Sequence, residues 1–136
     1  MSEILIQAKN IKKYFPTSDR GKVVKAVDDI SFDIYKGETL GVVGESGCGK
    51  STTGRMVLKL LDCTEGSVLY KGKDIGKMKG KEMRSLRKEM QIIFQDPYAS
   101  LDPRKTVFQI LAEPFWIHHP EMRKEDIYRE VEKLIE

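Results

Sequence analysis

Residues 44–51 carry the clearest chemistry of this chain, because they form a complete G-x-x-x-x-G-K-S motif, Gly44-Glu45-Ser46-Gly47-Cys48-Gly49-Lys50-Ser51. Glycines in such a loop let successive backbone N–H groups turn toward one phosphate. Lys50 can reach the β- and γ-phosphates of a nucleotide, and the Ser51 hydroxyl can ligate Mg²⁺. The motif therefore predicts a phosphate-binding loop.

The elements on either side of the motif fit this chemistry. Residues 38–43 are predicted to form a short buried strand, and residues 49–61 a helix. A helix N-terminus carries a partial positive charge, so strand, loop and helix together make an anion site. The alternative is an accidental glycine-rich turn. The predicted strand before the motif and the predicted helix after it both argue against that alternative.

Alternation of apolar and polar residues predicts antiparallel strands with one solvated face at residues 4–8, 23–27 and 30–35. Turns are expected at residues 16–21 and 36–37.

Beyond the motif, the periodicity changes between strand and helix. We expect a strand at residues 66–70, a helix at 80–89, and a buried strand at 90–94 that ends at Gln95. Helical periodicity also marks residues 106–116 and 124–136. The second of these helices has the apolar face Ile127, Val131, Leu134 and Ile135.

Bulk composition excludes several protein classes. The 136 residues amount to one domain, and 40% apolar with 33% charged residues is typical of a soluble globular protein. No apolar run approaches the ~20 residues of a membrane span, and the first residues lack a signal-peptide pattern. Cys48 and Cys63 form no ligand or redox motif, so we expect reduced thiols in a cytosolic protein.

The net charge of +3 is too small to argue for nucleic acid. Three acidic residues interrupt the one basic stretch, and Tyr70 at its edge is its only aromatic residue. We interpret the stretch as a solvated helix face. Its members are Lys71, Lys73, Lys77, Lys79, Lys81, Arg84, Arg87 and Lys88.

Three stretches resemble the ATP-binding subunits of ABC transporters, and in particular the oligopeptide and dipeptide import ATPases. They are residues 24–32, residues 37–52, and Phe94-Gln95-Asp96-Pro97-Tyr98-Ala99-Ser100-Leu101-Asp102-Pro103-Arg104. The resemblance covers essentially the whole chain. It implies an α/β P-loop NTPase fold of the ABC ATPase type. Residues 1–43 would form mainly antiparallel strands, residues 44–95 a partial RecA-like core, and residues 96–136 the start of a helical subdomain.

The resemblance also implies roles for single residues in binding ATP and Mg²⁺. Phe15 would stack on adenine, with Tyr14 as the near alternative, although either could be an ordinary strand-end aromatic. Lys50 would neutralise the β- and γ-phosphates, Ser51 would ligate Mg²⁺, and Thr52 would bond the α-phosphate. The remaining implied nucleotide contacts come from Gly44, Ser46, Gly47, Cys48 and Gly49.

Gln95 would reach Mg²⁺ and the γ-phosphate and link the nucleotide to a membrane subunit. The alternative is a polar residue that only caps a strand, and the string of residues that follows Gln95 argues against it. Other family motifs are absent from this sequence: the L-S-G-G-Q signature, the Walker B acids and the switch histidine. We expect His118 and His119 to be surface loop residues. The chain is therefore expected to be the N-terminal part of a longer subunit and to be inactive alone.

Implied partners are transporter membrane subunits, a second ATPase subunit in a homo- or heterodimer, and indirectly a solute-binding protein. The implied location is peripheral, at the cytoplasmic face of the cell membrane, and no nucleic acid is expected. Nickel and glutathione importers share the string after Gln95 and stay open as alternatives. A soluble ABC ATPase acting on nucleic acid would show tandem motor domains, and a GTPase would show D-x-x-G and N-K-x-D. None of these features is visible here.

Overall fold

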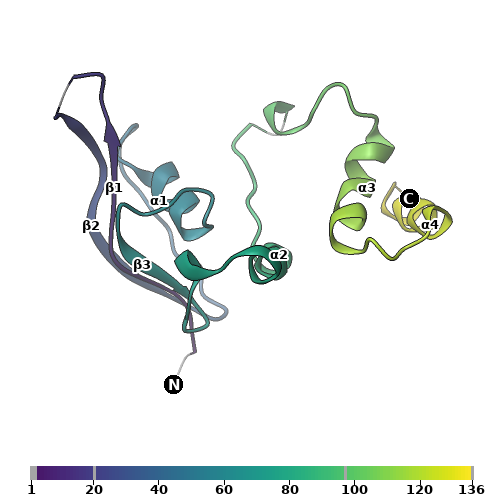
Figure 1. Cartoon of the computed structure of the whole chain (residues 1–136), viewed down its shortest axis with the longest axis horizontal. Coiled ribbons are helices and arrows are strands. Elements are labelled where there is room, and N and C mark those ends of the chain that lie inside the picture. The colour runs from purple at the N-terminus through teal and green to yellow at the C-terminus, as the bar shows by residue number, and fades with distance from the viewer. Residues whose placement is uncertain (1–2, 20, 97, 136) are drawn as a thin grey trace. The chain divides into compact units, whose positions relative to one another are not determined.

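The computed structural model describes residues 3–19, 21–96 and 98–135. The chain divides into two compact units, Met1–Gln91 and Ile92–Glu136. The first unit combines an antiparallel sheet with helices, and the second is helical (Figure 1). Within the described residues, no helix has both the length and the apolar character needed to cross a membrane.

Two long strands dominate the sheet of the first unit. β1 (Ile4–Pro16) pairs with β2 (Val23–Tyr35) on one side and with β3 (Glu65–Tyr70) on the other, and β4 (Lys73–Asp74) follows β3. All these pairs are antiparallel. The first predicted strand is therefore longer than expected, and the two predicted strands at residues 23–27 and 30–35 form one continuous strand.

Irregular pairing between β1 and β2 explains why their apolar pattern looked discontinuous. Lys13 pairs with Val27 but Tyr14 pairs with Lys25, so Ala26 is an extra residue at a β-bulge. A second register shift accompanies Asn10, whose φ of 46° is unusual for a residue with a side chain.

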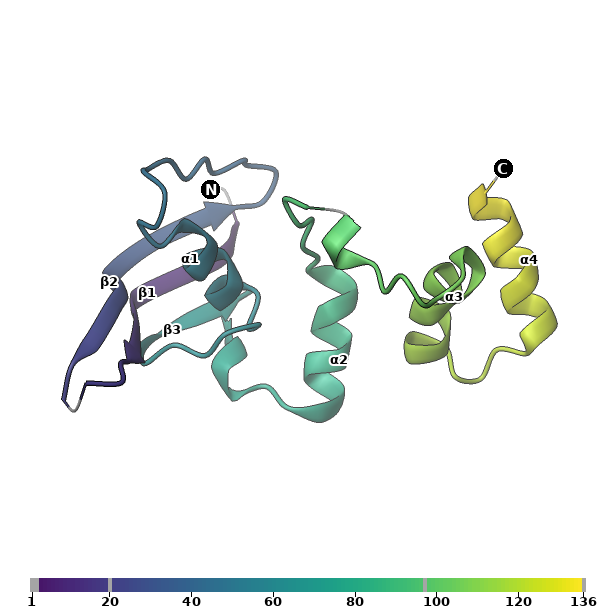
Figure 2. The ribbon, with the colours of Figure 1, turned by 90° about the horizontal axis from the view of Figure 1, so that it is seen from above.

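Helices α1 (Lys50–Val57) and α2 (Gly80–Glu89) complete the first unit, with a short 3₁₀ turn, η1 (Ile75–Lys77), between them in the chain. α1 lies over one face of the sheet (Figure 2). The helix predicted over residues 49–61 is shorter than expected because Lys59 leaves helical geometry with φ 53°. The buried core combines sheet and helix residues: Ala8, Ile11, Val27, Val68, Met56, Ile75 and Leu86.

Two predicted strands are wrong. Residues 38–43 and 90–94 are both described, and neither forms a strand. Val43 is 93% exposed and Ile93 is 97% exposed, so the predicted burial of these two side chains is wrong, whereas Met90 is buried as predicted. A strand satisfies its N–H and C=O groups on a neighbouring strand, and no strand in the described part of the chain pairs with either segment.

The second unit begins with an irregular segment, described over residues 92–96. It then forms a 3₁₀ turn, η2 (Tyr98–Ser100), and the helices α3 (Val107–His118) and α4 (Lys124–Ile135). Both predicted helices are confirmed. Thr106 and Gln109 form a capping box at the start of α3, with reciprocal hydrogen bonds of 2.8 and 3.2 Å.

The small core of the second unit contains Ala112, Ile127 and Val131. The apolar face predicted for the last helix is only half correct, because Leu134 and Ile135 are both 62% exposed. His118, expected in a surface loop, is instead the half-buried last residue of α3.

The basic stretch from Lys71 to Lys88 does not lie on one helix. It runs from the β3–β4 turn through η1 to α2, and its members are exposed except for half-buried Arg87. The prediction of solvated cations is therefore confirmed for seven of the eight residues named above.

Candidate functional site

The phosphate-binding motif joins α1 without an intervening turn. Gly49 is the residue before the helix, with φ 96°. Both the backbone N–H and the Oγ1 of buried Thr53 donate to the carbonyl oxygen of Gly49, at 2.8 and 3.0 Å. These two bonds hold the first helical turn directly against the loop. The first N–H groups of a helix have no intrahelical acceptor, and a glycine brings no side chain to cap them, so the end can receive an anion.

The Lys50 ammonium group lies over the loop. Its Nζ donates to the carbonyl oxygens of Gly44 and Glu45, at 2.7 and 2.5 Å, and lies 3.5 Å from Sγ of Cys48. The positive charge of Lys50 therefore lies on the loop that leads into α1. Helix α1 also has no acidic residue in its first turn to compete with a bound anion.

The other predicted loop residues sit at this helix start as the motif requires. Ser51 and Thr52 are the second and third residues of α1, exposed and half-buried respectively. A serine hydroxyl is a hard oxygen ligand of the kind that Mg²⁺ prefers, so Ser51 fits a metal held jointly with phosphate oxygens. The residues predicted for phosphate and metal, apart from Gln95, are thus contiguous in the structure.

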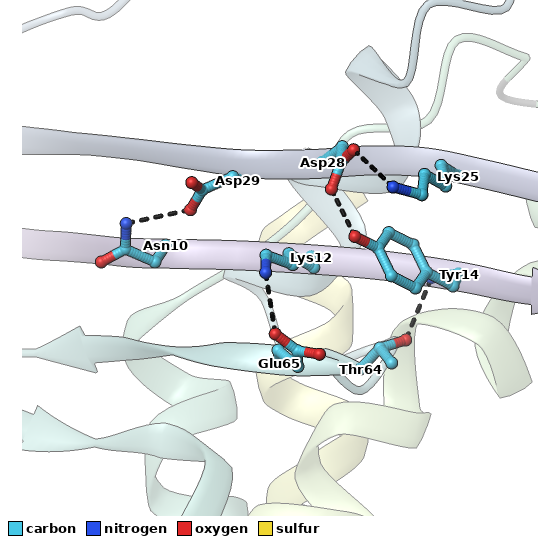
Figure 3. A network of polar contacts seen from close by, with 8 residues as sticks. All are labelled: Asn10, Lys12, Tyr14, Lys25, Asp28, Asp29, Thr64 and Glu65. Carbon is cyan, nitrogen blue, oxygen red and sulfur yellow. Dashed lines mark hydrogen bonds and ion pairs between the residues drawn. The ribbon is translucent and has the colours of Figure 1, made fainter.

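Phe15 and Tyr14 face opposite sides of the sheet. Successive side chains of a strand alternate, so Ile11, Lys13 and Phe15 share one face. Ile11 is fully buried in the core that includes Met56 of α1, which identifies this face as the one that α1 covers. Phe15 is 38% exposed, with Lys13 Nζ 5.3 Å from its ring centroid. The opposite face carries Tyr14 within a polar network (Figure 3).

Gln95 lies outside the first unit. It is exposed, in the irregular segment that precedes η2, and belongs to the unit Ile92–Glu136. Its predicted role at the metal and the γ-phosphate stays a prediction.

Two contributors to the site were not singled out from the sequence. Thr53 supports the loop through its double contact with Gly49. Its position four residues after Gly49 in a helix was the available signal, because threonine hydroxyls often bond the carbonyl four residues back. Ala26, at the β2 bulge, packs against Gly49. No local sequence pattern could have predicted a contact between residues so far apart in the chain.

Residues 27–136 match the sequence profile of the family described as "ABC transporter". The chain belongs to the ABC transporter family. Relatives include the oligopeptide transport ATP-binding proteins OppF and AppF of Bacillus subtilis (strain 168). OppF is 52% identical, and the match covers 100% of this chain and 44% of OppF. AppF is 51% identical, with coverage of 86% and 37%.

A glutathione import ATP-binding protein, GsiA of Pectobacterium atrosepticum, is 44% identical to this ABC family chain, with coverage of 91% and 21%. The chain therefore spans less than half the length of these curated relatives.

Solved structures support the same fold. The ATP-binding cassette MJ0796, in a dimeric post-hydrolysis state bound to ADP and Pi, superposes with a TM-score of 0.76. It is 22% identical, and the match covers 95% of this chain and 55% of that one. The predicted α/β fold of the ABC ATPase type is confirmed.

Proposed function

We propose that this chain is the nucleotide-binding part of an ATP-binding subunit that energises the import of oligopeptides or dipeptides through an ABC transporter. The observation that carries the proposal is the position of Lys50, whose ammonium group lies on the loop carbonyls next to the start of α1. The identity of 52% to an oligopeptide transport ATP-binding protein supports the solute class.

In this proposal MgATP supplies the energy-rich phosphate bond, and the chain supplies the binding groups. Lys50 neutralises the β- and γ-phosphates, while the loop N–H groups from Gly47 to Gly49 surround them. Ser51 ligates Mg²⁺ and Thr52 bonds the α-phosphate. Phe15 stacks on adenine; its place on the face that α1 covers favours it over Tyr14. As the family resemblance implies, Gln95 would reach Mg²⁺ and the γ-phosphate and would link the nucleotide to a membrane subunit.

The proposed assembly pairs two ATPase subunits with membrane subunits at the cytoplasmic face of the cell membrane, served by a solute-binding protein. Hydrolysis belongs to the assembled subunit, since phosphoryl transfer needs groups that hold the metal and the attacking water from a second side. This sequence holds neither the Walker B acids nor the switch histidine. The isolated 136-residue chain is expected to bind nucleotide weakly and to turn over ATP near background.

Lys50→Ala in the intact subunit tests the proposal. Hydrogen bonds to charged groups contribute about 1.5–3 kcal/mol each, so we expect ATP binding to weaken by roughly ten- to a hundredfold. ATPase activity and peptide uptake should be lost. Lys36→Ala is the matched control, because Lys36 is an exposed lysine in the turn after β2. Unchanged ATP turnover in the Lys50 variant would contradict the assignment.

Glutathione import is the second candidate, favoured by the 44% identity to a glutathione import protein. The two candidates share the nucleotide site and differ in the solute. Uptake of labelled peptide and labelled glutathione by the same intact transporter separates them.

A further inference from the structure

We propose that Tyr14 is a positioning residue for nucleotide binding. Its contacts on one face of the sheet hold β1 so that Phe15, on the other face, is placed for the base. The inference rests on the proposed function, in which Phe15 stacks on adenine. Tyr14 touches no nucleotide in this scheme and acts only through its neighbour.

The Tyr14 side chain is tied to β2. Its hydroxyl donates to Oδ1 of Asp28, and Lys25 Nζ donates to Oδ2 of the same carboxylate at 3.1 Å (Figure 3). The Lys25 ammonium also lies 5.1 Å from the Tyr14 ring centroid, a favourable cation–π distance. The phenol is thus held at both its hydroxyl and its ring.

The Tyr14 backbone is hydrogen-bonded on the other side of β1, to the segment that leads into β3. Its N–H donates to Oγ1 of Thr64 at 3.0 Å, and the Thr64 N–H donates to the carbonyl oxygen of Lys12 at 2.8 Å. Next to these bonds, Lys12 forms an ion pair of 2.8 Å with Glu65 at the start of β3. Residues 12–14 are therefore fixed between both neighbouring strands.

These contacts of Tyr14 lie at a point where the pairing of β1 with β2 is irregular. The bulge at Ala26 falls between Lys25 and Asp28, the two β2 residues that hold Tyr14. A bulge interrupts the ladder and increases the local twist, so backbone bonds alone constrain this stretch weakly. The tyrosine, held by Asp28 and Lys25, bridges the interruption.

Fixing Tyr14 fixes the direction of Phe15, because adjacent strand residues point to opposite faces. The cluster stays charged at neutral pH: the hydrogen bond from Tyr14, together with that from Lys25, holds the pKa of Asp28 below its usual range. The same bond to Asp28 raises the pKa of Tyr14, so the phenol keeps its proton. A neutral donor and an ionised acceptor make a strong hydrogen bond.

The test compares ATP with inorganic triphosphate, which has no base to stack. Affinities are measured by competition against a fluorescent ATP analogue in the intact subunit. Tyr14→Phe removes only the hydroxyl that donates to Asp28. We expect ATP affinity to fall about three- to tenfold, in line with the loss of one hydrogen bond, and triphosphate affinity to stay unchanged. Tyr35→Phe, the same chemical change at the far end of β2, should leave both affinities unchanged.

A double-mutant cycle shows whether Tyr14 acts through Phe15. Phe15→Ala should weaken ATP but not triphosphate, and adding Tyr14→Phe to it should cause no further loss. Asp28→Asn, which keeps the shape of the acceptor but removes its charge, should shift ATP affinity in the same direction as Tyr14→Phe. It serves as the second variant if Tyr14→Phe lowers the thermal unfolding midpoint too far for binding assays.

Three results would overturn the proposal: unchanged ATP affinity in Tyr14→Phe, an equal loss for ATP and triphosphate, or full additivity with Phe15→Ala. If Phe15→Ala itself leaves ATP affinity unchanged, the stacking role of Phe15 fails and the Tyr14 role fails with it. The Lys50 experiment would still decide the phosphate site separately.

Discussion

The carbonyl oxygen of Ala26 lies so close to Gly49 that a Cβ added to the glycine would sit 2.2 Å from it. The bulge in β2 thus packs directly against the residue that begins α1. Gly49 also has φ 96°, a conformation that L side chains rarely adopt. Two independent features therefore favour glycine at this position, and the approach fixes the phosphate loop against the sheet.

Gly49→Ala is accordingly expected to reduce the free energy of unfolding by more than ~1 kcal/mol, because both the strain and the clash must be relieved. ATP binding should fall in parallel. Gly54→Ala is the matched control in the same helix, since a Cβ there meets nothing within 4 Å. Alanine at Gly54 should be neutral or stabilising by up to ~1 kcal/mol. Urea unfolding and ATP titration measure both effects; similar behaviour of the two variants would contradict the packing described here.

Cys48 is expected to react with N-ethylmaleimide before Cys63. Cys48 is exposed in the phosphate loop, whereas Cys63 is half-buried and burial raises the pKa of its thiol, which lowers its reactive thiolate fraction. Alkylation at Cys48 should block ATP binding, and MgATP should protect the thiol. Peptide mapping by mass spectrometry identifies the modified residue, and Cys48→Ser provides the resistant control. Faster labelling of Cys63, or no protection by MgATP, would place Cys48 outside the nucleotide site.

Glu89 contacts Tyr70, the last residue of β3, and Lys71, which follows it. These contacts predict that the protein loses stability in acid. Lys71 Nζ donates to Oε2 of Glu89, as does the Tyr70 hydroxyl at 2.9 Å. Lys71 first, and then Tyr70, holds the pKa of Glu89 below its ordinary value of 4.5. A lowered folded-state pKa means that the unfolded chain binds the proton more tightly. The stabilisation is therefore complete above the ordinary pKa and is lost as the pH falls through the folded-state value.

We expect Glu89→Gln to remove this part of the pH dependence. Between about pH 5 and pH 3, wild-type protein should lose stability more steeply than the glutamine variant. Tyr70→Phe should give an intermediate slope, because it keeps the Lys71 contact. Denaturant unfolding at a series of pH values measures the slopes. Identical slopes for wild type and Glu89→Gln would contradict the role of this contact.

Arg87 of α2 holds the end of the helix that follows the phosphate loop. Its guanidinium donates to the carbonyl oxygens of Leu58 and Lys59, the second at 2.9 Å. These carbonyls lie just beyond α1, where a cation also complements the helix dipole. Arg87→Met keeps the apolar stem and should cost about 1–3 kcal/mol, measured by urea unfolding. Arg84→Met, at an exposed position of α2, is the control, and an equal loss in both variants would refute the bracing role.

Local chemistry was sufficient to predict much of the candidate site. The spacing of Gly44, Gly49, Lys50 and Ser51 predicts a phosphate loop, because each role depends on residues close together in the sequence. The helix at residues 80–89 was predicted with its observed bounds, and the family was recognised from short strings such as the one around Gln95. Neighbouring residues alone determine patterns of this kind.

Long-range pairing decided the rest. Residues 38–43 and 90–94 have strand-like sequences but form no strand in the described chain, because an extended segment needs a partner for its backbone groups. Only the structure shows which face of β1 the core covers, and this burial is what favours Phe15 over Tyr14 in the proposed function. Arg87 and Ala26 reached the loop and its helix only through tertiary packing. The sequence determined the chemistry that the loop can perform; the fold determined which distant residues hold that loop in place.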